Sequence, residues 1–121
     1  MQLAALRSLA PDTRVFVCQP VEFLSEWRFY VLAGRILGCG RYDPDGADDA
    51  PTPDERSVQA AITAYGRRGA YALDMGVLTN GATALVEVND AWATGLYAGA
   101  LTPAAYYTWL ASRWVELVAA G

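Results

Sequence analysis

The chain has 121 residues, the size of one domain, and its composition of 54% hydrophobic and 18% charged residues excludes a disordered or fibrous protein. Nine arginines against thirteen acidic residues give a formal net charge of −4, which argues against a general nucleic-acid or anionic-membrane surface. The sequence has no histidine and no lysine, so an imidazole base, a histidine metal site and a P-loop or Schiff-base lysine are excluded within this chain.

Other features concern the cellular compartment. Cys18 and Cys39 are too few ligands for a structural zinc site without histidine. The N-terminus lacks the basic and long apolar regions of a signal peptide, and no apolar stretch reaches the roughly 18 residues of a membrane span. We therefore expect a reduced, cytoplasmic domain with neither a nucleic-acid nor a membrane partner.

The first half of the sequence predicts a lead-in strand and a hairpin. Residues 1–12 read as a short helix or arm, and the apolar residues 14–18 as a strand. From Phe23 the side chains alternate, and Gly34 marks a turn into a partner strand over residues 35–42. One predicted face carries Trp27, Phe29 and Val31, and the other carries Glu26, Arg28 and Tyr30.

An exposed acidic loop over residues 43–50 leads to a predicted helix. Thr52 and Glu55 form a capping box around Pro53, and Gly66 ends the helix. The apolar stripe of this helix is Val58, Ala61, Ile62 and Tyr65.

The second half predicts another hairpin and a final helix. Strands over residues 71–78 and 83–89 are joined through Asn80 and Gly81, and Thr102 starts a helix that runs to Ala119. Its predicted buried residues are Tyr106, Leu110, Trp114 and Leu117. The order predicts an α+β fold as a single domain over residues 1–121. In it an antiparallel sheet of two hairpins plus the lead-in strand carries two main helices.

The second hairpin contains a candidate site. If Asn80 and Gly81 are the two central turn residues, Asp74 faces Glu87, and Asn89 lies on the same face. Directly opposed carboxylates are destabilising unless they are neutralised, and this donor set suits Mg²⁺ or Mn²⁺. The alternative is that both acids are solvated on an open sheet face. The apolar strands around both acids favour the metal, because a carboxylate there is costly unless it is paired.

Two arginine positions are also candidates for contacts. Arg28 lies on the polar face of its strand, where it could bind phosphate or carboxylate oxygens, or pair with Glu26 or another surface acid. Arg113 in the final helix either pairs with Glu116 or reaches the site. Residues 92–97 are expected to turn the chain and pack the final helix.

Several motifs together resemble the C-terminal half of an ATP-grasp domain, from a branch formerly filed as a domain of unknown function. These are Glu26 to Val31, the turn at Gly34, Leu73 to Val77, and Leu85 to Asn89, in a likeness that covers about residues 15–117.

The resemblance implies roles for named residues. Asp74, Glu87 and Asn89 match residues that hold magnesium on ATP phosphates, and Arg28 matches an arginine that touches phosphate or the acyl-phosphate. The hinge that contacts adenine falls at Gln19, Pro20 and Val21.

The implied activity is that of a carboxylate–amine ligase with ATP and Mg²⁺ (or Mn²⁺) as cofactors and a small-molecule or peptide carboxylate as substrate. The family's N-terminal subdomain, with its lysines, does not match any part of this sequence. The resemblance therefore leaves three possibilities: a fragment of a longer protein, a chain that works with a partner or as a homodimer, and a catalytically inactive module for protein interaction or oligomer assembly.

Overall fold

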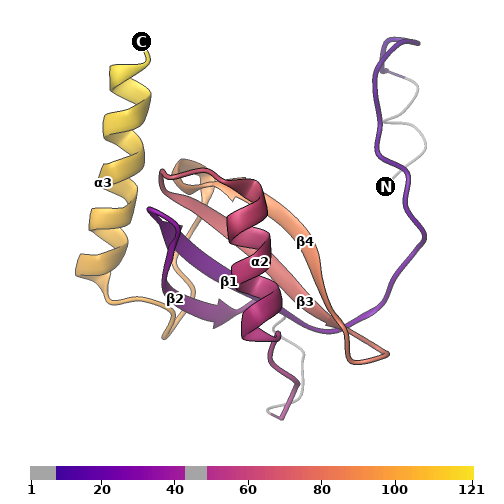
Figure 1. Ribbon diagram of the computed structural model, residues 1–121. Helices are drawn as coiled ribbons and strands as arrows, with labels where there is room; N and C mark the ends of the chain where they lie inside the picture. Colours follow the sequence, from indigo (N-terminus) through magenta and orange to yellow (C-terminus); the bar gives the residue numbers. More distant parts are fainter. Residues whose placement is uncertain (1–7, 43–48) are drawn as a thin grey trace.

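The computed structural model describes residues 8–42 and 49–121 and contains one four-stranded antiparallel sheet (Figure 1). The strands lie in the order β2-β1-β3-β4, so that each hairpin supplies one edge strand and one central strand. Their bounds are β1 Phe23–Leu32, β2 Arg35–Arg41, β3 Tyr71–Leu78 and β4 Thr83–Asp90; the helices are α2 Glu55–Tyr65, the short 3-10 helix η1 Ala91–Ala93, and α3 Pro103–Ala119. The predicted α+β class, both hairpins and both main helices are confirmed. The predictions for residues 1–7 and 43–48 lie outside the described residues.

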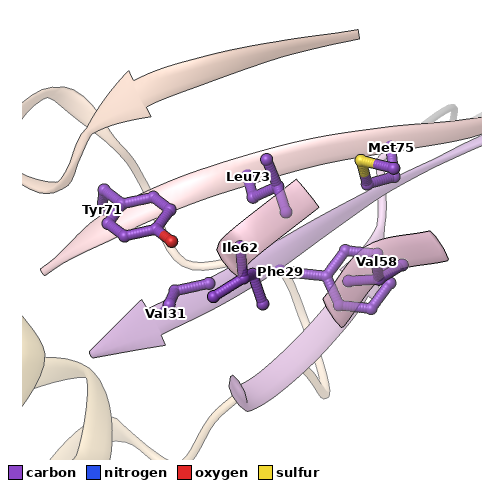
Figure 2. Packing of buried hydrophobic residues seen from close by; sticks show 7 residues of the cluster. All are labelled: Phe29, Val31, Val58, Ile62, Tyr71, Leu73 and Met75. Atoms are coloured by element: carbon purple, nitrogen blue, oxygen red, sulfur yellow. The ribbon is translucent and has the colours of Figure 1, made fainter. Parts of the chain in front are cut away.

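Helix α2 covers one face of the sheet, where it closes an apolar core (Figure 2). Alternate side chains of β1 and β3 point to this face, as a period of two requires. The core consists of Phe29, Val31, Val58, Ile62, Tyr71, Leu73 and Met75. Burying this apolar surface is the main force that holds α2 on the sheet.

The start of α2 differs from the prediction. Asp54, not Thr52, caps the helix: its carboxylate accepts hydrogen bonds from the backbone N–H (2.9 Å) and the hydroxyl (2.8 Å) of Ser57. Aspartate caps a helix at least as well as threonine, and the Asp54 N–H is held by the hydroxyl of Thr83 in β4 at 2.7 Å. The helix therefore begins later in the chain. Its predicted end at Gly66 is confirmed, with φ +69°.

The other face of the sheet is partly covered by α3 and the segment that precedes it. Trp109 is fully buried there, and its indole N–H donates to the carbonyl of Val31 at 2.9 Å. The prediction omitted Trp109 and wrongly buried Trp114 and Leu117, which are 51% and 36% exposed. Only the first half of α3 meets the sheet, and its later turns extend past the strands (Figure 1). No helix in the described ranges is both long and apolar enough to cross a membrane.

The predicted lead-in strand is wrong. Residues 13–22 form no strand and run away from the sheet as an extended segment (Figure 1), in which Phe16 is fully exposed. The β-branched and aromatic composition of residues 14–18 favours a strand, but a strand also needs a partner to pair with. No edge of this sheet pairs with them.

Candidate functional site

The register of the β3–β4 hairpin brings the two predicted carboxylates together. Asp74 faces Glu87, as predicted, but the turn is not the two-residue turn that the prediction assumed. Val77 pairs with Thr83, and the loop of residues 79–81 has Gly81 at φ +84°, which is the three-residue hairpin with a left-handed last residue.

A β-bulge restores the predicted pairing. The register shifts between Asp74 and Met75, where β4 places the extra residue Val86. Without this bulge the three-residue loop would put Asp74 opposite Val86 and turn Glu87 to the other face. The predicted pair is therefore correct because the longer loop and the bulge offset each other.

Arg28 lies directly beside Asp74, on the neighbouring central strand. Its guanidinium donates through Nε to Oδ1 of Asp74 at 2.8 Å and through Nη2 to Oδ2 at 2.6 Å. Asp74 is 0% exposed and the Arg28 side chain 12% exposed, so this is a nearly buried bidentate pair. The hydrogen bonds to Asp74 raise the pKa of Arg28, although burial opposes them. Of the contacts considered for Arg28, the structure shows the pair with Asp74 rather than one with Glu26.

Asn89 joins the two carboxylates. Its Nδ2 donates to Oδ2 of Asp74 and to Oε1 of Glu87, both at 3.0 Å. Ionised carboxylates only accept hydrogen bonds, so the amide must direct its nitrogen to both of them. The amide thus bridges two like charges that would otherwise repel one another across the hairpin.

Two tyrosine rings flank the Arg28 guanidinium. The rings of Tyr42 and Tyr97 have their centroids 5.5 Å and 5.3 Å from Cζ of Arg28 and stack on each other at 5.8 Å. Burial raises the pKa of Tyr42 well above its ordinary value, and the charges of Asp74 and Glu26 add to this. The Tyr42 phenol therefore stays protonated and donates to Glu26 at 3.3 Å.

Sequence reasoning missed both rings, although β2 carries a signal for Tyr97. A side chain at Gly38 would collide with the carbonyl of Ala100, and a Cβ at Gly40 would lie 3.2 Å from that of Tyr97. These glycines let the loop before α3 rest on β2. Tyr30 fixes the same loop, since its hydroxyl donates to the carbonyl of Gly95 at 2.8 Å and accepts from the N–H of Tyr97 at 3.0 Å.

The structure does not bring the predicted adenine hinge to this cluster. Gln19, Pro20 and Val21 are exposed in the extended segment before β1, and no hydrogen bond joins them to the rest of the described chain. Their assignment stays a prediction.

The donor chemistry of the cluster fits a hard divalent cation. Asp74, Glu87 and Asn89 offer two carboxylates and an amide oxygen, the ligand types that Mg²⁺ and Mn²⁺ take alongside water or phosphate oxygens. Glu87 is exposed, and within the described ranges its Oε2 accepts no hydrogen bond. No three Asp, Glu or Cys side chains converge in the described part of the chain, so a cation here would need ligands from outside the protein.

A second charged cluster is separate and structural. Arg113 pairs with Asp90 (2.6 Å) and also with Glu116 (3.0 Å), which answers the question that the sequence left open. Glu116 further accepts from Arg67 (2.8 Å) and from the N–H of Ala70 (3.2 Å). The hydrogen bonds from Arg113 lower the pKa of Asp90 to about 2, against the effect of burial. This network ties α3 to the end of β4 and to the start of β3.

Comparisons with known proteins add the following. A family model that describes an ATP-grasp domain, the second family of its clade, matches residues 1–109. The solved structure of the ATP-grasp ligase PsnB, complexed with a minimal precursor, is similar at 15% identity and a TM-score of 0.49, over 78% of this chain and 36% of that one. The chain thus spans about a third of the length of that protein. No curated protein matches.

Proposed function

This chain belongs to the ATP-grasp domain family, and we propose that it supplies the metal- and phosphate-binding part of an ATP-dependent carboxylate–amine ligase. The observation that supports this most directly is the buried Arg28–Asp74 pair beside Glu87 and Asn89, on the uncovered half of the sheet. A buried ion pair is a costly arrangement that contributes little to stability by itself. A ligand-binding role gives a reason for its presence.

In this proposal Asp74, Glu87 and Asn89 hold Mg²⁺ or Mn²⁺. The bound cation neutralises charge on the transferred phosphoryl group, the main demand of such a reaction. Arg28 donates hydrogen bonds to phosphate oxygens, for which the planar guanidinium is suited. The Tyr42 and Tyr97 rings keep that guanidinium in place.

The proposed chemistry has two steps. A substrate carboxylate, from a small molecule or a peptide, attacks the γ-phosphorus of ATP to give an acyl-phosphate and ADP. An amine then attacks the acyl carbon and releases phosphate, which leaves an amide bond. Neither step needs a protein nucleophile.

The site is open to solvent at Glu87, so we propose that a further part closes it. That part is a subdomain elsewhere in a longer protein, a separate partner or a second copy. A closed cleft strengthens each electrostatic contact with the nucleotide because it excludes water.

Calorimetric titration of the chain with Mg²⁺-ATP tests the proposal. We expect binding in the millimolar range that weakens at least about tenfold in Glu87→Gln, since a charged ligand to the cation is lost. Glu55→Gln is the matched control, because Glu55 is an exposed acid at the start of α2. Equal binding by wild type and Glu87→Gln, or no binding by wild type, would contradict the proposal.

A second candidate is a non-catalytic module for protein interaction or oligomer assembly. It is favoured by the exposed apolar side chains of Val15, Phe16 and Val17 and of Trp114 and Val118 on α3. This alternative expects self-association in light scattering and no response to nucleotide, whereas the ligase proposal expects nucleotide binding.

A further inference from the structure

We propose that Arg28 is an exchangeable counter-ion for Asp74, so that a cation gains access to Asp74 only when an anion draws Arg28 away. This inference rests on the proposed function, because the anion is a nucleotide phosphate and the cation is its metal. It adds that metal binding and anion binding are coupled through one side chain of the protein.

The first support is that Asp74 has no vacant approach. Both of its oxygens accept hydrogen bonds from Arg28, Oδ2 accepts a further one from Asn89, and none of the residue is exposed to solvent. A cation that approaches from solvent meets Glu87 first. It reaches Asp74 only if the guanidinium gives up at least one carboxylate oxygen.

The second support is that Arg28 has donors to spare. A guanidinium carries five N–H groups, and Asp74 engages one on Nε and one on Nη2. The side chain retains 12% exposure, so a phosphate oxygen can meet its remaining N–H groups before the bonds to Asp74 break. The exchange therefore passes through a shared state and does not expose an unpaired buried charge, which would be costly.

The third support is the pair of rings around the guanidinium. Attraction between a cation and the faces of Tyr42 and Tyr97 does not depend on which acceptor the cation is bonded to. The rings thus hold Arg28 in the site while its hydrogen-bond partner changes.

Charge balance points the same way. Arg28 balances Asp74, so a divalent cation placed beside the intact pair lies close to a positive guanidinium and is repelled. A phosphate on Arg28 removes that repulsion while it supplies oxygen ligands to the metal. Cation and anion are then favoured together and disfavoured separately.

The test measures Mn²⁺ binding by electron paramagnetic resonance, with Mn²⁺ alone and with Mn²⁺ plus ATP, for wild type and Arg28→Lys. Lysine keeps the positive charge but cannot grip both carboxylate oxygens. We expect Arg28→Lys to bind Mn²⁺ alone about tenfold more tightly than wild type does, the effect of one charge-assisted hydrogen bond. A general electrostatic influence of the cation predicts no change, because the charge is conserved.

The outcomes separate the two proposals. Equal or weaker binding of Mn²⁺ alone by Arg28→Lys overturns the exchange, even if wild type binds Mn²⁺ with ATP. Absence of Mn²⁺ binding by both proteins, with and without ATP, overturns the proposed function and this inference with it.

A second pair of variants covers the case in which Arg28→Lys does not fold. Tyr97→Leu removes one ring from Arg28, whereas Tyr97→Phe keeps the ring and removes only its hydroxyl. The N–H of Tyr97 that bonds to Tyr30 is unaffected in both. We expect tighter binding of Mn²⁺ alone in Tyr97→Leu, where the pair is loosened, and wild-type binding in Tyr97→Phe. Equal binding by the two variants overturns the exchange.

Discussion

The two faces of the sheet are built from the same strands but are used differently. On the α2 face, Leu73 and its neighbours form one continuous apolar core. On the opposite face, α3 covers only the end that carries Tyr30 and Ala72, and the uncovered part carries Arg28 and Asp74. The alternation along β3 therefore places a leucine and a charged aspartate at adjacent positions, each buried in a different way.

Small neighbours and polar partners explain why the second face tolerates a buried charge. Asp74 lies between Ala72 and Gly76 on its face, and a side chain at Gly76 would collide with the Phe23 ring. The charge of Asp74 is met by side chains from β1 and β4 rather than by a covering helix. This half of the second face is thus held by polar contacts, whereas the α2 face is held by apolar ones.

The largest expected effect is on the covered end of the second face. Trp109→Ala removes a fully buried ring and its hydrogen bond, so we expect a loss of about 4 kcal/mol in the free energy of unfolding. Trp114→Ala, five positions further along α3, removes a ring that is 51% exposed and should cost about 1 kcal/mol or less. Urea unfolding measures both. Equal losses would mean that α3 packs through the face that the sequence predicted.

The polar half should respond almost as strongly to loss of its buried charge. Asp74→Asn leaves Arg28 without its ionised partner, and breaking a nearly buried pair in this way costs about 3 kcal/mol. Glu87→Gln changes an exposed acid on the same face and should leave the unfolding free energy within about 0.5 kcal/mol. If Asp74→Asn were as stable as wild type, the pair would not be buried as described.

Asn89 tests the contact between the two acids. Asn89→Leu removes the amide that bridges Asp74 and Glu87, so the carboxylates repel one another, and we expect a loss of about 1–2 kcal/mol at neutral pH. Combining it with Glu87→Gln should recover part of that loss, because only one charge remains on the hairpin. Additive losses in this double-mutant cycle would show that the amide does not couple the two acids.

The smallest effect is a pH dependence outside both faces. Asp90 has a pKa of about 2 in the folded chain because Arg113 donates to it, against about 3.9 for an unperturbed aspartate. A lowered folded-state pKa stabilises the fold above the unfolded pKa, and the contribution is lost as the pH falls from about 4 to 2.

Thermal melting of Asp90→Asn beside wild type measures this contribution. Because the Asp90 side chain is 40% exposed, solvent screens the pair, and we expect a difference in Tm of only about 2 °C at pH 7 that disappears near pH 2. A difference that persisted at pH 2 would point to a cause other than this ion pair.

Much of the fold could be predicted from the sequence, because alternation and turn residues specify the hairpins locally. The N-terminal strand and the buried face of α3 could not, since both depend on which surfaces are near. Residues 14–18 have strand composition but no partner, and Trp109 is buried because of where α3 crosses the sheet.

The candidate site was predictable in part for the same reason. Facing of Asp74 and Glu87 follows from the hairpin, although the three-residue loop and the bulge at Val86 were not foreseen. The pairing of Arg28 with Asp74 and the ring of Tyr97 come from contacts between distant parts of the chain. Spacing along the sequence carries no information about such contacts.

The most direct test of the proposed site is to locate bound Mn²⁺-ATP on the protein by paramagnetic broadening of backbone amide NMR signals. A metal held on the open half of the second face should broaden the signals of Asp74, Glu87 and Asn89. It should leave those of α2, across the sheet, sharp. Selective broadening around Glu87 is the result that we predict. Broadening centred on α2, or no selective broadening at all, would contradict the assignment of this cluster as the metal- and phosphate-binding site.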